Sequence, residues 1–483
     1  MNRKMIFFIL GQSLKIEAAL MLLPMTVALV CGENTMPFVF SIILTLCFGI
    51  LISLRKPDNS TIFAREGFVA VSLVWICMSL CGALPFVFSG EIPCYLDALF
   101  ETVSGFTTTG ASVLTDIEAC SKGILFWRSF THWIGGLGVL VFIMAILPMS
   151  GEHSMHIMRA EVPGPVVGKL VPKAADTAKI LYIIYAALTV LETLLLMLGG
   201  LSFFDALLHA FGTAGTGGFS TRNASIGAFG SSYVEIVVAS FLVLFGINFN
   251  LYYMIAIRKY RNAVKSEELY VYLSIIAVSI LSIAAGICPQ YGSFAVSLRH
   301  AFFNVASIIS TAGFCTEDFT LWPQYTQFIL VLLMFCGACA GSTGGGIKIS
   351  RVIILFKDSI ANAIRMISPR RIKHVKVDGR TVPQSVIGTV SSFFFIYMLV
   401  LLACTLIVSF DGYDFATSFT ASLSCISNIG PGLSRVGPSG NYAIFSVVPK
   451  LAMTVTMLLG RLEIYPVLIL FASLFKISGT SRR

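Results

Sequence analysis

Four short stretches place small polar residues and glycine within apolar sequence, and the chemistry they offer is that of backbone carbonyls. They read SGFTTTGAS, GTAGTGGFS, IISTAGFCT and SCISNIGPG, and they end at Ser112, Ser220, Thr316 and Gly432. A turn through glycine can adopt backbone angles that other residues avoid and can aim successive carbonyl oxygens at one point, where they replace the water around a cation. The four stretches therefore predict four turns that serve one cation path.

The four turns align on one glycine each, which indicates an internal repeat. The aligned residues are Gly110, Gly218, Gly313 and Gly430. Asp97 and Asp205 each lie thirteen residues before the glycine of their turn, whereas the third and fourth stretches keep the apolar and aromatic pattern without the aspartate. We expect a half-helix before each turn, and we expect the two aspartates either to cap these helices or to attract the ion. The alternative for the glycines is close helix packing.

The composition identifies the elements that must position these turns as membrane spans. The 483 residues are 56% hydrophobic and 12% charged, with a mean hydropathy of +0.87. Apolar runs long enough to cross a hydrocarbon core of about 30 Å predict a polytopic, all-α membrane protein. Ten spans are expected, at 14–31, 36–54, 67–88, 125–148, 178–201, 233–256, 269–288, 325–347, 386–409 and 446–474. The first span has no cleavage site after it and is expected to be retained.

Each turn and its half-helix fall between two spans, and this order repeats along the chain. A half-helix is too short to cross the membrane, so it is expected to be re-entrant and to point its negative end at mid-membrane. Residues 1–60 form two extra N-terminal helices, and the four units that follow are 61–150, 151–262, 263–360 and 361–483. Four such units in one chain can close into a ring around a single axis.

The distribution of charge orients the expected spans. If alternate loops lie on opposite sides, 26 of the 33 lysines and arginines lie on the side of the termini. By the positive-inside rule both termini are cytoplasmic, and the turns approach from outside. This topology accounts for the basic stretch RMISPRRIKHVK, so no nucleic-acid partner is expected. The six histidines show no HExxH motif and no link to a nucleophile, so no enzyme is expected.

A glycine-rich stretch in the third unit must be distinguished from a phosphate-binding loop. It comprises Gly341, Ser342, Thr343, Gly344, Gly345, Gly346 and Lys348. A phosphate-binding loop needs lysine and then serine or threonine directly after the last glycine, whereas Ile347 intervenes here and Ile349 follows the lysine. Three consecutive glycines inside an apolar span instead predict a broken helix over 337–348. The break is either a gate in the ion path or a passive kink.

Two ionisable residues lie in the last apolar span. Arg461 and Glu463 are unfavourable there unless they face water or a partner. We expect Arg461 to face the ion path, where its charge would repel a cation and limit flux. The alternative is that Arg461 pairs with Glu463 or a half-helix carboxylate for folding alone. Asn248 and Asn250, in the stretch GINFNLYYM, are expected to form hydrogen bonds between helices.

The four turns, the stretch GSTGGGIKIS at 341–350 and the stretch MLLGRLEIYP at 457–466 resemble the TrkH/TrkG branch of the Trk/Ktr/HKT superfamily of potassium transporters. The resemblance covers almost the whole chain, and the two extra N-terminal spans are typical of this branch. It implies four M1–P–M2 units around one potassium path, with residues 337–348 as an intramembrane gate. A serine at the first filter position goes with sodium transport in plant relatives, and Gly110 stands there in this chain.

The resemblance also implies a selectivity filter, partners and a location. The filter residues would be Thr108, Thr109, Gly110, Thr216, Gly217, Gly218, Thr311, Ala312, Gly313, Asn428, Ile429 and Gly430. The implied partners are a second copy of the chain, membrane lipid, and a cytosolic ring of regulatory subunits called TrkA in this branch. Any ATP, ADP or NAD would bind that ring, and no cofactor besides the potassium ion would bind this chain. The implied location is the bacterial cytoplasmic (inner) membrane.

Three functions remain open from the sequence. They are channel-like potassium uptake, secondary transport that couples potassium to a proton or a sodium ion, and a pore that accepts ammonium. Each unit begins and ends on the same side, so the repeats are parallel and differ from the inverted repeats of many secondary transporters. This difference favours the channel-like function.

Overall fold

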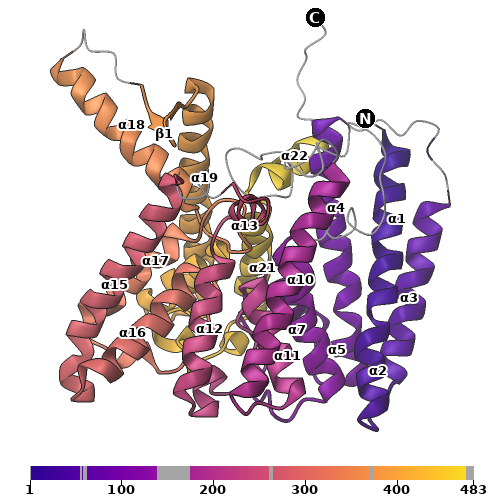
Figure 1. The fold of residues 1–483 in the computed structure, drawn as a ribbon. Coiled ribbons are helices and arrows are strands. Elements are labelled where there is room, and N and C mark those ends of the chain that lie inside the picture. The colour runs from indigo at the N-terminus through magenta and orange to yellow at the C-terminus, as the bar shows by residue number, and fades with distance from the viewer. Residues whose placement is uncertain are drawn as a thin grey trace, which may run out of the picture.

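The computed structural model describes residues 2–54, 57, 63–138, 174–259, 265–368 and 374–474. Its long helices run side by side (Figure 1). At the N-terminal edge α1 (Arg3–Leu20) continues into α2 (Leu22–Val30), and α3 (Met36–Ser53) returns beside them. A Cβ atom added at Gly11 would lie 2.6 Å from the carbonyl oxygen of Gly49. The two glycines therefore let the backbones of α1 and α3 approach closely.

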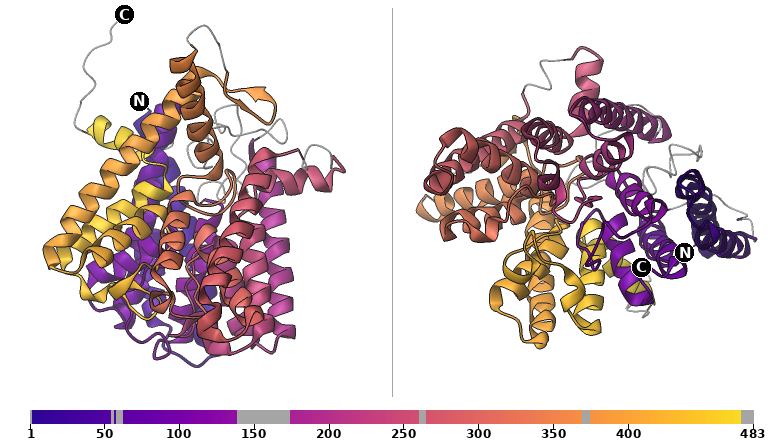
Figure 2. Two further views of the ribbon diagram at one scale, coloured as in Figure 1. Left: turned by 90° about the vertical axis from the view of Figure 1, so that its left-hand side faces the viewer. Right: turned by 90° about the horizontal axis from the view of Figure 1, so that it is seen from below.

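The order long helix, short helix, turn, helix recurs four times after these helices. Unit 1 contains α4 (Ala64–Gly82), α5 (Leu84–Ser89), α6 (Tyr95–Phe106) and α7 (Lys122–Gly136). Unit 2 contains α10 (Ala174–Leu198), α11 (Phe203–Gly215), α12 (Ser232–Phe245) and α13 (Phe249–Ala256). Unit 3 contains α15 (Glu267–Tyr291), α16 (Phe294–Ile309), α17 (Gln324–Cys336) and α18 (Ile349–Ile367). Unit 4 contains α19 (Gln384–Val408), α20 (Phe415–Ser427), α21 (Val447–Arg461) and α22 (Tyr465–Leu474). Seen from below in Figure 2, the units surround a common centre, and α1 and α3 lie outside it.

The short helices before the four turns are α6, α11, α16 and α20, and they contain 12, 13, 16 and 13 residues, respectively. At 1.5 Å per residue these helices are roughly 18–24 Å long, which is less than the membrane core. The expectation that Asp97 and Asp205 cap two of them is wrong, because each is the third residue of its helix. Asp97 forms an ion pair with Lys450 of α21, with 2.7 Å between Oδ1 and Nζ. Asp205 accepts a hydrogen bond from Ser202, which caps α11.

Six of the described helices are long and apolar enough to cross a membrane, and two further candidates are bent pairs. The expected span over 233–256 is bent, because α12 and α13 meet at 89°. Asn248 caps α13 by accepting the N–H of Asn250 at 2.9 Å, which differs from the expected interhelical bond. The expected span over 446–474 is also bent, since α21 and α22 meet at 113°. The expected span 125–148 lies outside the described residues beyond residue 138.

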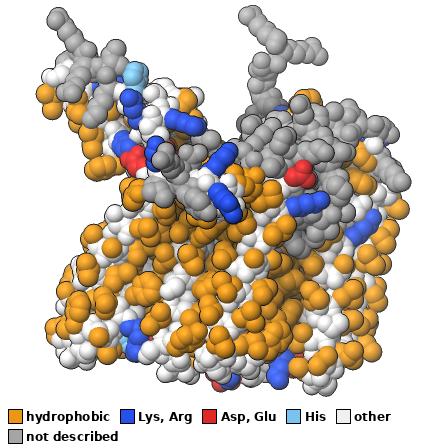
Figure 3. Space-filling model, viewed as in Figure 1, with side chains coloured by type: hydrophobic (Ala, Val, Ile, Leu, Met, Phe, Trp, Pro, Cys, Tyr) orange, Lys and Arg blue, Asp and Glu red, His pale blue; other side chains and the backbone are white. Residues whose placement is uncertain are grey.

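The flank of the molecule is apolar, and charged side chains gather at its ends. Large hydrophobic side chains are exposed on α3 and α19, among them Phe40, Leu51, Phe395 and Leu406. Figure 3 shows hydrophobic side chains across the flank and most of the visible lysines and arginines toward the upper end. An exposed apolar flank of this extent requires lipid or a partner. The chain is therefore a multi-pass membrane protein.

One small element departs from the all-α expectation. The strands β1 (Lys376–Val377) and β2 (Arg380–Thr381) form an antiparallel hairpin between α18 and α19. Gly379 has a φ of 75° in the tight turn that joins the two strands. The expected unit boundaries after residues 60, 150 and 262 lie outside the described residues, and the boundary after 360 falls within α18.

Candidate functional site

The four turns share one backbone conformation. The residue two before each aligned glycine is left-handed, and these residues are Thr108, Thr216, Thr311 and Asn428, with φ of 55°, 56°, 64° and 56°. The aligned glycines Gly110, Gly218, Gly313 and Gly430 have φ of 79°, 75°, 80° and 101°. Residues with side chains adopt this region rarely, and such strain persists only where the surrounding structure imposes it. The fourth turn keeps the conformation although its sequence differs most.

The same hydrogen bond anchors each turn to its half-helix. In every turn the N–H of the residue before the aligned glycine donates to a carbonyl five residues earlier, at 2.8–3.0 Å. The donor and acceptor pairs are Thr109 and Ser104, Gly217 and Gly212, Ala312 and Ser307, and Ile429 and Ser424. These bonds join N–H groups of the turns to carbonyls of the half-helices, so they leave the carbonyl oxygens of the turns available for another partner.

The turns touch one another in order around a closed ring. At each aligned glycine an added Cβ would clash with, or closely approach, a carbonyl oxygen of the next turn. The contacts are Gly110 with Gly217, Gly218 with Ala312, Gly313 with Ile429, and Gly430 with Thr109. Glycine is therefore required on two counts, by its positive φ and by the neighbouring carbonyl. The contacts run from each turn to the next and from the fourth turn back to the first.

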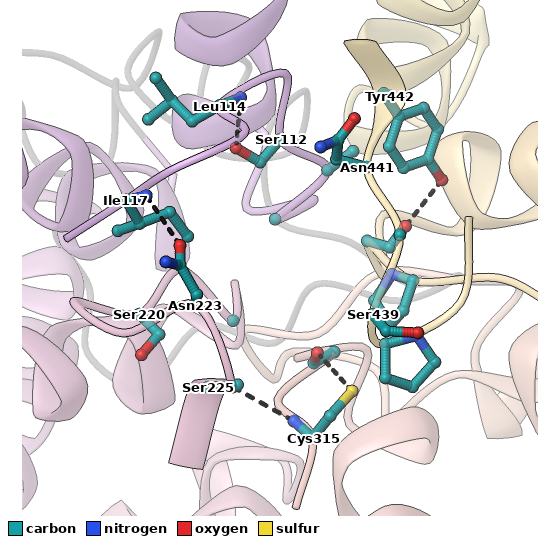
Figure 4. A pocket seen from close by; sticks show the side chains of 18 of the residues that line it. Ser112, Leu114, Ile117, Ser220, Asn223, Ser225, Cys315, Ser439, Asn441 and Tyr442 are labelled. Carbon is teal, nitrogen blue, oxygen red and sulfur yellow. Dashed lines mark hydrogen bonds between the residues drawn. The ribbon is translucent and has the colours of Figure 1, made fainter. Parts of the chain in front are cut away.

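An open cavity of about 170 Å³ lies against the ring, and all four aligned glycines line it. Figure 4 shows Ser112, Ser220, Cys315 and Tyr442 around this cavity. Tyr442 donates its hydroxyl to the Gly430 carbonyl at 2.7 Å, which fixes the fourth turn from this side. At the rim the Asn223 amide donates to Asp116 at 2.9 Å, and this bond lowers the pKa of the Asp116 carboxyl.

Residues 337–348 between α17 and α18 are not helical, as the glycine-rich sequence predicts. Positive φ angles occur in this loop at Gly337, Gly341, Gly346 and Lys348. The Cys339 N–H donates to the Gly246 carbonyl, and the Phe249 N–H donates to the Gly341 carbonyl, both at 3.0 Å. The loop is thus hydrogen-bonded to the break between α12 and α13 of the neighbouring unit.

The loop also lies directly against turns 3 and 4, which are the turns of Gly313 and Gly430. The Gly345 N–H donates to Thr311 Oγ1 at 2.6 Å. A Cβ added at Gly344 would lie 2.7 Å from the Ser310 carbonyl oxygen, and one added at Gly345 would clash with the Ser427 carbonyl oxygen. Only glycine permits so close an approach of two backbones. The loop therefore occupies the space beside the ring.

Arg461 joins the loop of unit 3 to unit 1. Its Nη1 donates to the Thr343 carbonyl at 2.8 Å. Its Nη2 donates to the Gly135 and Gly136 carbonyls at the end of α7, each at 2.5 Å. The buried guanidinium of unit 4 thus connects the loop of unit 3 with unit 1.

Further charged residues hold the loop from its α18 end. Lys348 is buried and donates to the Gly344 carbonyl within the loop. Glu463 forms its ion pair with Arg351 of α18, with 2.6 Å between Oε2 and Nη2. This contact ties the break before α22 to the start of α18.

Glu268 of α15 anchors both ends of the loop. Its Oε1 accepts the N–H of Ala340 at 2.8 Å and the N–H of Ser350 at 3.0 Å. The side chain is buried, so these bonds are shielded from competing water. This role of Glu268 was not predicted, although a glutamate at the start of an apolar span is a signal for it.

Replacing Glu268 with alanine is expected to loosen the loop. The loss of two bonds to a charged acceptor is expected to lower stability by about 2–4 kcal/mol, which appears as a fall in the unfolding temperature of the purified protein. The control is Glu267→Ala, because Glu267 pairs with Lys357 at the surface, where an ion pair contributes little. Equal unfolding temperatures for the two variants would contradict the anchoring role.

Sequence reasoning also missed a group of polar side chains behind the first two turns. His132 of α7 bonds the Gly105 carbonyl through Nδ1 at 2.8 Å and accepts the Phe219 N–H through Nε2 at 3.2 Å. Beside it, Glu101 and Arg128 form a buried ion pair. His132 therefore links the half-helix of unit 1 to turn 2, and the signal for all three was an ionisable residue within apolar sequence.

The fold and the ring define a class, a multi-pass helical membrane protein in which four turns of one chain surround a single axis. Residues 34–277 and 290–477 match the family model TrkH, described as a cation transport protein. The chain belongs to the TrkH family. The resemblance seen in its turns and in its loop is thereby confirmed.

Relatives and a solved structure match almost the full chain. The chain is 38% identical over 467 residues to the Trk system potassium uptake protein TrkG of Escherichia coli (strain K12), covering 94% of this chain and 95% of that protein. It is 35% identical over 483 residues to TrkH of the same strain, covering 98% and 99%. The crystal structure of the potassium transporter TrkH from Vibrio parahaemolyticus matches with a TM-score of 0.88 at 33% identity, covering 98% of this chain and 100% of that one.

Proposed function

We propose that this chain takes up potassium across the bacterial cytoplasmic membrane through the ring of four turns. The observation that carries the proposal is the closure of the ring, in which each left-handed glycine meets a carbonyl of the next turn. Carbonyl oxygens arranged in this way can replace the hydration shell of a cation. Potassium is supported as that cation by the Trk system relatives, which are named as potassium uptake proteins.

In this proposal the turns form a selectivity filter. Its carbonyls come from residues 108–110, 216–218, 311–313 and 428–430. The half-helices α6, α11, α16 and α20 lead into the turns with their C-terminal ends. The negative end of each helix dipole favours a cation at the centre of the ring.

The loop 337–348 acts as the gate, and Arg461 holds it in place. This role is supported by the contacts of the loop with turns 3 and 4 and by the bonds of Arg461 to Thr343 and to α7. A positive charge beside the path repels an approaching cation. Opening then requires the loop to leave the ring and the bonds of Arg461 to break.

The proposed partners act from the side of the termini, which we place in the cytoplasm. A cytosolic nucleotide-binding ring would contact the basic segments around α18, and nucleotide would bind that ring and not this chain. Figure 1 shows α18 and α19 projecting beyond the other helices. Exposed apolar side chains of α18, such as Phe356 and Met366, support contact with a second copy of the chain.

Ion flux tests the proposal. Purified protein in liposomes, under an imposed potential of known sign, should pass potassium faster than sodium and should do so with no coupling ion in the bath. Flux that requires protons or sodium would favour the alternative of a secondary transporter, and ammonium is measured in the same way. Absence of potassium flux with and without the cytosolic partner would contradict the proposal.

The orientation gives a labelling prediction. A cysteine placed at Asn223 should react with an impermeant thiol reagent from outside the cell, whereas one placed at Ser368 should not, because the charge distribution puts them on opposite sides. Both positions are exposed. The background protein needs serine at the exposed cysteines Cys31, Cys47 and Cys94. The reverse pattern of labelling would overturn the orientation.

A further inference from the structure

A buried ion pair lies behind the first two turns. Glu101 of α6 and Arg128 of α7 have side chains that are 0% and 2% exposed, and 2.6 Å separates Glu101 Oε1 from Arg128 Nε. Removing two charges from water is unfavourable unless further hydrogen bonds satisfy their remaining polar atoms. The partners that supply those bonds indicate what the pair holds in place.

The carboxylate of Glu101 binds the segment that leaves turn 1. Ser112 Oγ donates to Oε1 at 2.9 Å, and the Val113 N–H donates to Oε2 at 2.8 Å. Ser112 lies two residues after the aligned Gly110. Both oxygens of the carboxylate therefore fix the chain just after the glycine of turn 1.

The guanidinium of Arg128 binds the matching position in turn 2. Its Nη1 donates to the Ser220 carbonyl at 3.0 Å, and its Cζ lies 3.6 Å from the centre of the Phe219 ring. Ser220 lies two residues after the aligned Gly218, the same offset as in turn 1. Figure 4 shows Ser112 and Ser220 on the wall of the cavity. The ion pair is thus one continuous link from turn 1 to turn 2.

The other units carry different residues nine positions before the aligned glycine, where unit 1 has Glu101. These residues are His209, Asn304 and Ala421. His209 Nε2 bonds Ser220 Oγ at 2.8 Å, within its own unit. Asn304 donates to the His300 carbonyl of its own helix, and its Oδ1 has no hydrogen-bond partner in the part of the chain that the structure describes. Of the four equivalent residues only Glu101 has a carboxylate, so the charged link belongs to the junction of turns 1 and 2.

We infer that Glu101 and Arg128 are positioning residues that fix the distance between turns 1 and 2 and thereby set the discrimination between potassium and sodium. This inference rests on the proposed function of the ring. Carbonyls that coordinate potassium must move inward to coordinate the smaller sodium ion, and turns held apart by a rigid link resist that movement. The pair acts through Ser112 and Ser220 and does not touch the ion.

The test compares the ratio of potassium to sodium flux into liposomes, per folded molecule. Arg128→Lys keeps a positive charge beside Glu101 but loses the planar group that reaches Ser220 and stacks on Phe219. Glu101→Gln keeps the shape and removes the charge. We expect each variant to lower the flux ratio about tenfold, the effect of losing roughly one charge-assisted hydrogen bond.

The control is Glu235→Gln, which weakens the ion pair of Glu235 with Arg299, at 3.0 Å, outside the four turns. Its flux ratio is expected to equal that of the wild type. Size-exclusion profiles and unfolding temperatures establish which variants fold. If Glu101→Gln does not fold, the flux ratio of Arg128→Lys tests the inference. If neither variant folds, the flux ratio of Ser112→Ala tests it, because this variant removes one hydroxyl bonded to Glu101.

A folded Arg128→Lys variant with the wild-type flux ratio overturns the inference, because this variant keeps the charge and breaks the link. A ratio that falls equally in Glu235→Gln overturns it as well. Wild-type protein with no preference for potassium contradicts the proposed function before any variant is compared. A selective wild type with equally selective variants contradicts this inference alone.

Discussion

Replacing Gly110 with serine is expected to lower the ratio of potassium to sodium flux by about a hundredfold, because backbone strain and steric overlap act on the same carbonyls. Gly110 has a φ of 79°, a conformation that is unfavourable for a residue with a side chain by ~1–2 kcal/mol. A Cβ there would also clash with the Gly217 carbonyl oxygen. Serine must therefore displace carbonyls that we propose to select potassium. Paired flux measurements in liposomes give the ratio.

The control for this variant is Gly90→Ser. Gly90 is the C-cap residue that follows α5 and has the same φ of 79°, but a Cβ added there would meet nothing within 4 Å. Both variants carry the same backbone strain, and only Gly110→Ser disturbs the ring. We expect Gly90→Ser to keep the wild-type ratio. A folded Gly110→Ser protein that also keeps it would remove Gly110 from the ion path.

Arg461→Ala and Gly345→Ala are each expected to raise potassium flux about tenfold in the absence of the cytosolic partner, since each removes contacts that hold the loop against the ring. Arg461→Ala breaks the hydrogen bonds to the loop and to α7 and removes a positive charge from beside the path. Alanine at Gly345 would clash with the Ser427 carbonyl oxygen and displace the loop from turn 4. The measurement is flux per folded molecule with and without the partner.

The control here is Gly388→Ala in α19, where an added Cβ would meet nothing within 4 Å. Replacing Gly344, Gly345 and Gly346 together should have a larger effect, because alanine favours a continuous helix by roughly 0.5–1 kcal/mol per residue over glycine. If these variants fold and their flux is unchanged in both conditions, the loop is a passive kink and the gate assignment is wrong.

The turns and the loop could be predicted because each is encoded by a short stretch of its own sequence. Gly430 could be aligned with Gly110 although Asn428 and Pro431 differ from the residues around the other glycines. Both glycines take a positive φ, 79° at Gly110 and 101° at Gly430, because the angle requirement acts on the glycine itself. Three consecutive glycines likewise predict a broken helix without knowledge of what packs against it.

The bends and the buried charges depend on contacts between segments, and they were missed for that reason. Hydropathy does not distinguish a straight span from a bent one. Asn248 was a signal for the bend between α12 and α13, because asparagine favours a helix cap over a helix interior. Ile464 has a φ of 68°, which its branched side chain disfavours, and its own sequence gives no sign of it. Glu101 and Arg128 lie on different helices, so their pairing appears only once α6 and α7 are packed.

Helices are interrupted in three of the four units. Helix α12 ends at Phe245, α17 ends at Cys336, and α21 ends at Arg461. The breaks contact one another, since the loop bonds the break after α12 and Arg461 bonds the loop. They form a layer of joints between the turns and the helices α18 and α22. Breaks at the ends of helices can act as hinges, so a movement of α18 or α22 can be accommodated in this layer. If the loop is the gate that we propose, it can move at these joints while the hydrogen bonds that anchor each turn to its half-helix remain in place.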